Sequence, residues 1–171
     1  MSPTTLSYDE LKQEFTQQLQ KTENGVLATS DGNYVTARGM LILSDGEKIM
    51  CFTGENTRKY KQLQANKNVA LSINNLQIEG IATLTGHPSN ERNAGFIRMF
   101  KEKFPKYYEF WGPICENPDS DARVIEIIPS KLTAYKASPD IGPHLDILNV
   151  VTETATRVNL MEMPQTNYDQ Y

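Results

Sequence analysis

The segment from Phe52 to Lys61 holds the residue types with the clearest chemistry, at a strand end, a short turn and the start of a helix. The backbone N–H groups of a first helical turn are unpaired and carry partial positive charge. Arg58 and Lys59 fall in that turn, where each added cation is unfavourable by about 0.3–1 kcal/mol, and Glu55 offsets only part of this. A phosphate would relieve the surplus, because N–H groups, a threonine hydroxyl and a guanidinium all bind its oxygens. The pattern therefore predicts an anion site; the alternative is that both side chains point into water.

Arg38 strengthens the anion interpretation, because it interrupts an otherwise neutral, apolar strand over residues 35–41. The short turn at Ser44–Gly46 predicts that this strand folds back onto the strand that ends at Thr53. Such a pairing would bring Arg38 close to the predicted anion site. The neighbouring Gly39 would let a flat ligand approach the backbone. The alternative is an exposed position for Arg38 at the edge of the sheet.

The elements that must position these residues are predicted from hydrophobic periodicity and turn residues. Ser7 caps a first helix, in which Leu11, Phe15 and Leu19 recur every four residues. Asn56 or Thr57 caps the second. About six mostly antiparallel strands with helices between them indicate a mainly β fold, a small β-barrel decorated by helices. Predicted helices span residues 7–20, 56–67 and 89–104, the last continuing through 105–111; predicted strands span 26–29, 34–43, 48–53, 69–73, 78–85 and 124–136, with a bend at Pro129, and residues 112–121 are predicted to form a loop.

The length and composition are those of one globular domain, with 171 residues, 39% apolar and 22% charged. The net charge of −4 argues against broad binding to nucleic acid or to an anionic membrane. No apolar run approaches the roughly 20 residues that span a bilayer, and the first residues lack a signal-peptide pattern. Cys51 and Cys115, with two histidines in the chain, make no zinc pattern, so we expect reduced thiols in a cytoplasmic protein.

After residue 137 Pro, Asn, Thr and Gln become frequent, which divides the chain into a domain over 1–137 and a partly ordered C-terminal extension over 138–171.

Several short motifs in a fixed order carry a resemblance to a known family. They are Gly25–Thr29, Asp31-Gly32, Arg38–Met40, Phe52-Thr53 and Thr57–Lys59, followed by Glu79–Leu84, Lys103–Pro105 and Ile127–Tyr135. Each motif is weak alone, but their order and spacing from Gly25 to Lys136 resemble the FMN-binding split-barrel family. That family is typified by pyridoxamine 5′-phosphate oxidase and includes the general-stress flavoproteins.

The resemblance implies a split β-barrel and a homodimer with two FMN sites at the subunit interface. It implies an FMN-dependent oxidoreductase, in which a hydride moves between the flavin and a small-molecule substrate or a nicotinamide donor. It assigns no catalytic residue and no metal. A non-catalytic FMN or haem binding protein, or a flavin-free interaction protein, remain the alternatives. The resemblance places FMN-binding roles on Arg38, Gly39, Met40, Phe52, Thr53, Thr57, Arg58, Lys59 and, in place of a family glutamine, Asn75.

Two departures from the family pattern argue against activity on pyridoxamine 5′-phosphate itself. Leu43 stands where the oxidase carries a second flavin-site lysine, five residues after Arg38. Arg157 is followed by Val158 and Asn159, without the Arg-x-His element of the oxidase.

Three further groups have open roles. The aromatic residues Tyr107, Tyr108, Phe110 and Trp111 either stack on a flavin or pack a helix against the barrel. His87 and His144 lie beside prolines in predicted loops and are weak acid–base candidates.

Overall fold

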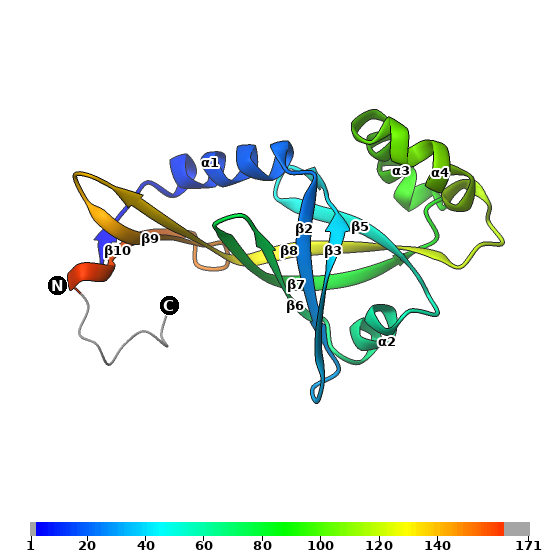
Figure 1. Cartoon of the computed structure of the whole chain (residues 1–171), viewed down its shortest axis with the longest axis horizontal. Coiled ribbons are helices and arrows are strands. Elements are labelled where there is room, and N and C mark those ends of the chain that lie inside the picture. Colours follow the sequence, from blue (N-terminus) through cyan, green and yellow to red (C-terminus); the bar gives the residue numbers. More distant parts are fainter. Residues whose placement is uncertain (1–2, 163–171) are drawn as a thin grey trace.

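A computed structural model describes residues 3–162 of the chain, which form one antiparallel sheet with helices packed on it (Figure 1). Ten strands occur in this range, against about six predicted, and they follow the order β1-β10-β9-β8-β7-β6-β2-β3, with β5 on β8 and β4 on β5. The strands are β1 (Thr4–Thr5), β2 (Asn24–Ser30), β3 (Val35–Leu41), β4 (Leu43–Asp45), β5 (Lys48–Gly54), β6 (Asn68–Ile73), β7 (Leu76–Gly86), β8 (Ala122–Ser138), β9 (Gly142–Asn149) and β10 (Thr154–Asn159). The mainly β prediction is confirmed, and the sheet is not closed.

The helices are α1 (Tyr8–Lys21), α2 (Arg58–Ala65), α3 (Ala94–Lys103) and α4 (Pro105–Glu116), with short 3-10 turns at Glu91–Asn93 and Leu160–Glu162. The predicted caps of the first two helices are confirmed, because Ser7 and Thr57 each accept a hydrogen bond from a backbone N–H of the first turn. Within residues 3–162, no helix has both the length and the apolar composition needed to cross a bilayer.

Strand β8 organises the sheet, since it is 17 residues long and uses both of its edges. One edge pairs with β7; the other pairs with β5 over residues 122–127 and with β9 over residues 131–138. The predicted bend is a bulge: Gly80 lies opposite Pro129 and Glu79 opposite Lys131, so Ser130 is an extra residue. At Gly80 the chains approach so closely that a Cβ would lie 2.6 Å from the Ile128 carbonyl oxygen. This bulge divides β8 into a half that carries β5 and a half that carries β9.

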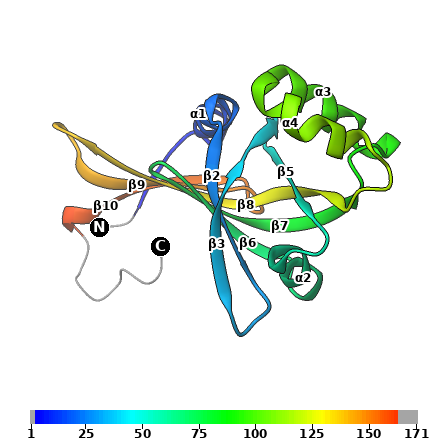
Figure 2. The same ribbon diagram turned by 45° about the vertical axis from the view of Figure 1, so that its right-hand side comes forward.

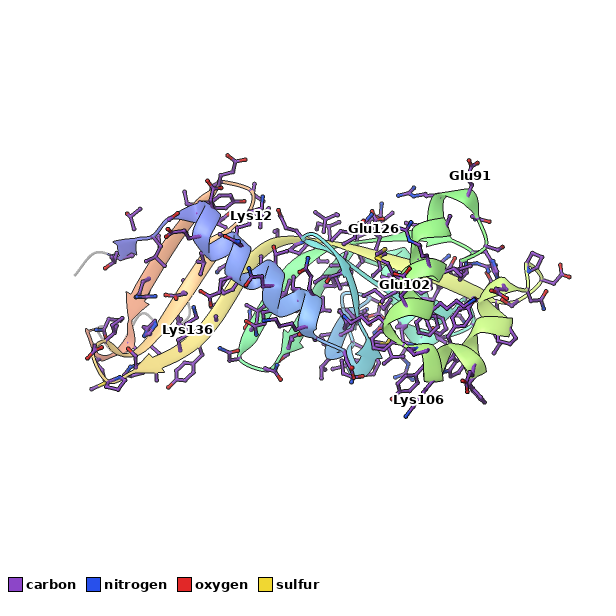
Figure 3. The ribbon with its side chains drawn as sticks, turned by 90° about the horizontal axis from the view of Figure 1, so that it is seen from above. Lys12, Glu91, Glu102, Lys106, Glu126 and Lys136 are labelled. Carbon is purple, nitrogen blue, oxygen red and sulfur yellow. The ribbon has the colours of Figure 1, made fainter. Side chains whose placement is uncertain are left out.

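Two apolar clusters stabilise the two ends of the sheet. Leu11, Phe15 and Leu19 of α1, the residues with the predicted spacing of four, are buried in the larger cluster. The smaller cluster joins α3 and α4 to β4, β5 and β8 through Phe96, Phe100 and other buried residues. Viewed from above, α1 lies across β8, β9 and β10 while α3 and α4 cover the opposite end (Figure 3).

The predicted pairing of the Arg38 strand with the strand ending at Thr53 is wrong. Strand β3 pairs with β2, and the turn at Ser44–Gly46 instead joins β4 to β5. The predicted strand over 34–43 is interrupted at Ile42, which is fully buried and donates its N–H to the Glu23 carbonyl oxygen at 2.9 Å. The inward turn at this residue detaches β4 from β3.

The predicted loop over 112–121 is also partly wrong, because α4 continues to Glu116 with Pro113 inside it. Gly112 allows the Tyr108 ring to pack against the helix backbone, since a Cβ would lie 2.8 Å from that ring. Cys115 is completely buried and anchors the last turn. Apolar burial thus offsets the hydrogen bond that proline cannot make.

The segment after residue 137 extends the same sheet, where β9 pairs with β8 and β10 pairs with β9. Residues 163–171 of that segment lie outside the described part of the chain. Asp146 of β9 is completely buried and accepts two hydrogen bonds from Arg157, at 2.6 and 2.7 Å. Lys136 lies 3.0 Å from Asp146 and 2.6 Å from Glu14 of α1, so the buried carboxylate is linked to the helix above it.

We expect Asp146→Asn to lower the free energy of unfolding by about 3 kcal/mol at neutral pH, because two cations lose their buried partner. Burial alone would raise the pKa of Asp146, but the hydrogen bonds from Arg157 and Lys136 outweigh it, so the pKa lies below its ordinary 3.8. The carboxylate therefore stabilises the fold above pH 3.8. This contribution is lost as the pH falls through the lower pKa that Asp146 has in the folded state.

Urea unfolding at neutral pH and again in the acid range would measure this effect. The gap between wild type and variant should shrink in acid, while the exposed Asp140→Asn control should match wild type at both. An equal gap at both pH values would contradict the assignment.

Candidate functional site

A cavity of about 330 Å³ lies where β3, β5, the start of α2 and α4 meet, within the size range of small-molecule sites. Strand β5 runs from the α3–α4 pair to the start of α2 and so forms one wall (Figure 2). Six of the nine residues predicted from the sequence line the cavity, together with Leu41, Gly54 and Trp111. Those six are Gly39, Met40, Phe52, Thr53, Thr57 and Lys59.

The polar end of the cavity is a chain of hydroxyl groups that leads to a lysine. Thr57 caps α2, and its Oγ1 donates to the Gly54 carbonyl oxygen at 2.8 Å. The Thr57 hydroxyl lies 2.9 Å from the hydroxyl of Thr53, which is 4% exposed. Lys59 Nζ donates to Thr53 Oγ1 at 3.0 Å. The ammonium group is thereby held at the cavity wall by a neutral oxygen.

Arg38 supplies a second cation next to Lys59, on the inner side of β3. Its guanidinium donates to the Leu27 carbonyl oxygen at 2.9 Å, to Thr29 Oγ1 at 2.8 Å and to Thr36 Oγ1. All three acceptors are uncharged. Strand β3 does not pair with β5 as predicted, and Arg38 is not among the residues that line the cavity. Its charge still lies near enough to Lys59 to lower the pKa of that lysine.

Neither cation has a carboxylate partner among residues 3–162. Burial, followed by the nearby Arg38 charge, lowers the pKa of Lys59, and burial lowers the pKa of Arg38. Glu55, the acid closest in sequence, is bound by Arg123 at 2.6 Å. The positive charge at this end of the cavity is therefore not balanced by an acid of residues 3–162.

The other end of the cavity is aromatic and apolar. The Phe52 ring lies 5.8 Å from Trp111 and 5.5 Å from Phe100, measured between ring centroids. Trp111, from α4, lines the cavity and remains 37% exposed, while Tyr108 packs on Phe100 in the apolar cluster beneath. Packing of the helix against the sheet is thus confirmed for Tyr108, and stacking on a flavin stays a prediction for Trp111.

Besides Arg38, two other predicted cofactor residues are not among those that line the cavity. Arg58 is exposed at the first position of α2 and lies near Asp31. The pKa of Asp31 is lowered chiefly by hydrogen bonds from backbone N–H groups, with a smaller contribution from the Arg58 charge. Asn75 lies in the β6–β7 turn, where its side chain donates to the Tyr135 carbonyl oxygen at 2.8 Å and accepts from Gln18 at 3.2 Å.

Residues 11–136 match the family model for pyridoxamine 5′-phosphate oxidase, a match that covers well over half of the chain. The chain belongs to the pyridoxamine 5′-phosphate oxidase family. The resemblance read from the motifs is therefore confirmed. No curated protein matches the sequence.

Solved structures that resemble this chain show the same fold at low sequence identity. A putative pyridoxamine 5′-phosphate oxidase from Listeria innocua is 23% identical, with a TM-score of 0.52 over 71% of this chain and 95% of its own. General Stress Protein 26 from Bacillus anthracis is 19% identical, with a TM-score of 0.55 over 72% and 92%. The heme storage protein HutZ from Vibrio cholerae is 16% identical, with a TM-score of 0.58 over 72% and 94%. These likenesses establish the split-barrel type of fold.

The two departures from the oxidase pattern have clear structural positions in this family member. Leu43 is 3% exposed and belongs to the apolar cluster beneath α3, so it replaces a charged group by core packing. Arg157 of β10 is bound to Asp146 of β9, in the extension of the sheet beyond the β8 bulge. Neither Leu43 nor Arg157 therefore supplies a further free cation to the cavity.

The two histidines are structural groups rather than cavity groups. His87 is 7% exposed; its Nδ1 accepts from the Ser89 N–H at 3.1 Å, and its Nε2 lies 2.9 Å from the Ser120 hydroxyl. His144 is 3% exposed, with Nδ1 2.9 Å from the Gly142 carbonyl oxygen. Neither lines the cavity.

The two cysteines are buried and free. Burial raises the pKa of Cys51 to about 12 and that of Cys115 to about 11, so both thiols stay protonated near neutral pH.

Sequence reasoning missed one polar residue that supports the site, Gln62 of α2. This side chain is 2% exposed and accepts hydrogen bonds from Thr29 and Thr36, the two threonines that hold Arg38. The sequence signal for this role is the position of Gln62 next to Leu63, which is buried. An amide side chain on the inner face of the helix needs polar partners there.

Proposed function

We propose that this chain binds FMN in the cavity between β3, β5, α2 and α4 and serves as an FMN-dependent oxidoreductase. One observation carries the proposal: Lys59 at the cavity wall and the neighbouring Arg38 are partly buried and have no carboxylate partner within residues 3–162, while the other end of the cavity is aromatic. FMN has the complementary form, with a phosphate dianion at one end and a planar ring system at the other.

The roles of the individual residues follow from their positions. Lys59 and Arg38, with the hydroxyls of Thr53 and Thr57, would hold the phosphate near the N-terminus of α2. Gly39 would allow the ring close to β3, since no atom lies within 4 Å of the position of a Cβ there. Phe52 and Trp111 would exclude water from the ring. When bound, the flavin supplies two-electron hydride chemistry, and the protein supplies binding, orientation and electrostatics.

Haem is the other cofactor suggested by the relatives, because HutZ is described as a heme storage protein. Histidine is a common axial ligand of haem iron. The two histidines of this chain are buried, and neither lines the cavity. Both ring nitrogens of His87 are hydrogen-bonded, and His144 is hydrogen-bonded through Nδ1. This arrangement favours FMN.

The homodimer implied by the family is part of the proposal. The outer face of the sheet exposes apolar side chains, with Val26 45%, Ile81 44% and Ile128 49% exposed. Gly39 of the cavity is paired with Val26 across β2 and β3, so the cavity adjoins this face. Exposed apolar patches of this kind are typical of protein–protein interfaces. A second copy would therefore cover the open side of the cavity.

The absorption spectrum of the purified protein tests the proposed cofactor directly. We expect flavin absorption bands and release of a compound with the mass of FMN on denaturation. Trp111 is the only tryptophan in the chain, so added FMN should quench the fluorescence of the apo-protein. A colourless protein whose fluorescence is unaffected by FMN would contradict the proposal.

Lys59→Ala should weaken FMN binding by about 1.5–3 kcal/mol, since it removes a charge-assisted hydrogen bond to the phosphate. Arg58→Ala should weaken it by less than about 1 kcal/mol, because exposed charges contribute little. Lys61→Ala, an exposed position on the same helix, is the control and should bind like wild type. Fluorescence titration gives the three dissociation constants; an unchanged value for Lys59→Ala would remove the phosphate assignment.

Sedimentation at micromolar concentration should report about twice the 19.3 kDa chain mass. Ile128→Lys should shift the protein toward the monomer and weaken FMN binding together, because it places a charge in the apolar face. A wild-type monomer that binds FMN tightly would rule out the shared site.

The FMN-loaded protein should not oxidise pyridoxamine 5′-phosphate at a useful rate. The substrate carries its own phosphate, and Arg38 and Lys59 are already assigned to the phosphate of FMN. Loss of a second clamp should cost a hundredfold or more in rate, on the order of several kcal/mol in the transition state. The measurement is pyridoxal 5′-phosphate formation under air, and turnover on the order of 0.1 per second would show that other residues supply the clamp.

A further inference from the structure

We infer that Gln62 is a positioning residue, which acts through Thr29 and Thr36 to orient the Arg38 guanidinium for the phosphate of the cofactor. The inference rests on the proposed FMN site and adds a residue to it that does not line the cavity.

Gln62 is the centre of a buried hydrogen-bond network between α2 and the β2–β3 hairpin. Its Oε1 accepts from Thr29 Oγ1 and from Thr36 Oγ1, both at 2.7 Å. Its Nε2 donates to the Tyr34 carbonyl oxygen at 2.9 Å. Because a carbonyl oxygen can only accept, this last bond fixes which end of the amide faces the threonines.

The direction of these bonds determines what the threonines can offer to Arg38. A hydroxyl group has one hydrogen to donate, and both hydroxyls donate it to Gln62. Their lone pairs are therefore turned toward the Arg38 Nη1 and Nη2 groups, which donate to Thr29 and Thr36. Gln62 thus fixes the acceptors, and the acceptors fix the guanidinium.

The network leaves Arg38 with unused N–H donors that point in a defined direction. A guanidinium has five N–H donors, and the structure gives three of them to Leu27, Thr29 and Thr36. Two donors remain for a ligand, on a group held in one plane beside the Lys59 ammonium. Preorganised donors of this kind bind an anion without the entropic cost of ordering a long side chain.

An alternative role for Gln62 is attachment of α2 to the sheet alone. The two roles differ in one measurable respect, because Arg38 and Lys59 recognise the phosphate of FMN and riboflavin lacks that phosphate. A positioning role affects the preference for FMN over riboflavin, whereas simple loosening of α2 affects both ligands alike.

The experiment compares Gln62→Met with Gln64→Met, an exposed position on the same helix. Apo-protein is titrated with FMN and with riboflavin, following the fluorescence of the single tryptophan. We expect Gln62→Met to raise the FMN dissociation constant about tenfold and the riboflavin constant less than about twofold, with Gln64→Met unchanged. Thr36→Val, which removes one of the two threonine links, should give a smaller loss of the same preference.

A proportional rise of both dissociation constants in Gln62→Met, or no rise in either, would overturn the positioning role while leaving the FMN site intact. If Gln62→Met does not fold, the Thr36→Val result decides by the same criterion. A wild-type protein that binds FMN no better than riboflavin would overturn the proposed phosphate site and the role of Gln62 together.

Discussion

The site depends on one unfavourable arrangement, two cations of like charge held close together and partly removed from water. The interaction between Arg38 and Lys59 is repulsive, and burial opposes both charges. The fold tolerates this because each cation keeps partial contact with solvent and donates to neutral oxygens on the hairpin or the β5–α2 turn. An anion between them would turn the repulsion into attraction. This arrangement gives a functional role to three elements: the β2–β3 hairpin, the end of β5 and the start of α2.

Strand β8 separates the demands of the site from the demands of stability. Before the bulge at Ser130 it pairs with β5, whose last residues form the cavity wall. Beyond the bulge the same edge pairs with β9, which in turn pairs with β10. The buried Asp146 cluster lies in this second half, with its charges balanced by Arg157 and Lys136. The charges of the Asp146 cluster are thus paired, whereas Arg38 and Lys59 have no carboxylate partner within residues 3–162. This contrast supports the proposal that the two cations serve a ligand.

Local signals were sufficient wherever short-range physics decides the structure. The cap at Ser7, the cap at Thr57 and the surplus charge at the start of α2 are properties of neighbouring residues, and the sequence predicted them. The partner of the Arg38 strand was wrong because the decisive contact, from Ile42 to Glu23, joins residues far apart in the chain. The last two strands were assigned to an extension because Pro, Asn, Thr and Gln become frequent after residue 137, and the sequence offered no sign that Asp146 is paired within the sheet. Its partner Arg157 is 11 residues away, and only the register of β9 and β10 brings them together.

The choice of acceptors around Arg38 explains how a cation can be held firmly without losing its charge. A carboxylate at the position of Gln62 would orient the guanidinium equally well, but it would also neutralise it and compete with a phosphate. Threonine hydroxyls and an amide supply direction without net charge, so the potential at the cavity remains positive. Glu55, the nearest acid in the sequence, is drawn away by Arg123. Two separate features therefore keep negative charge out of this end of the cavity.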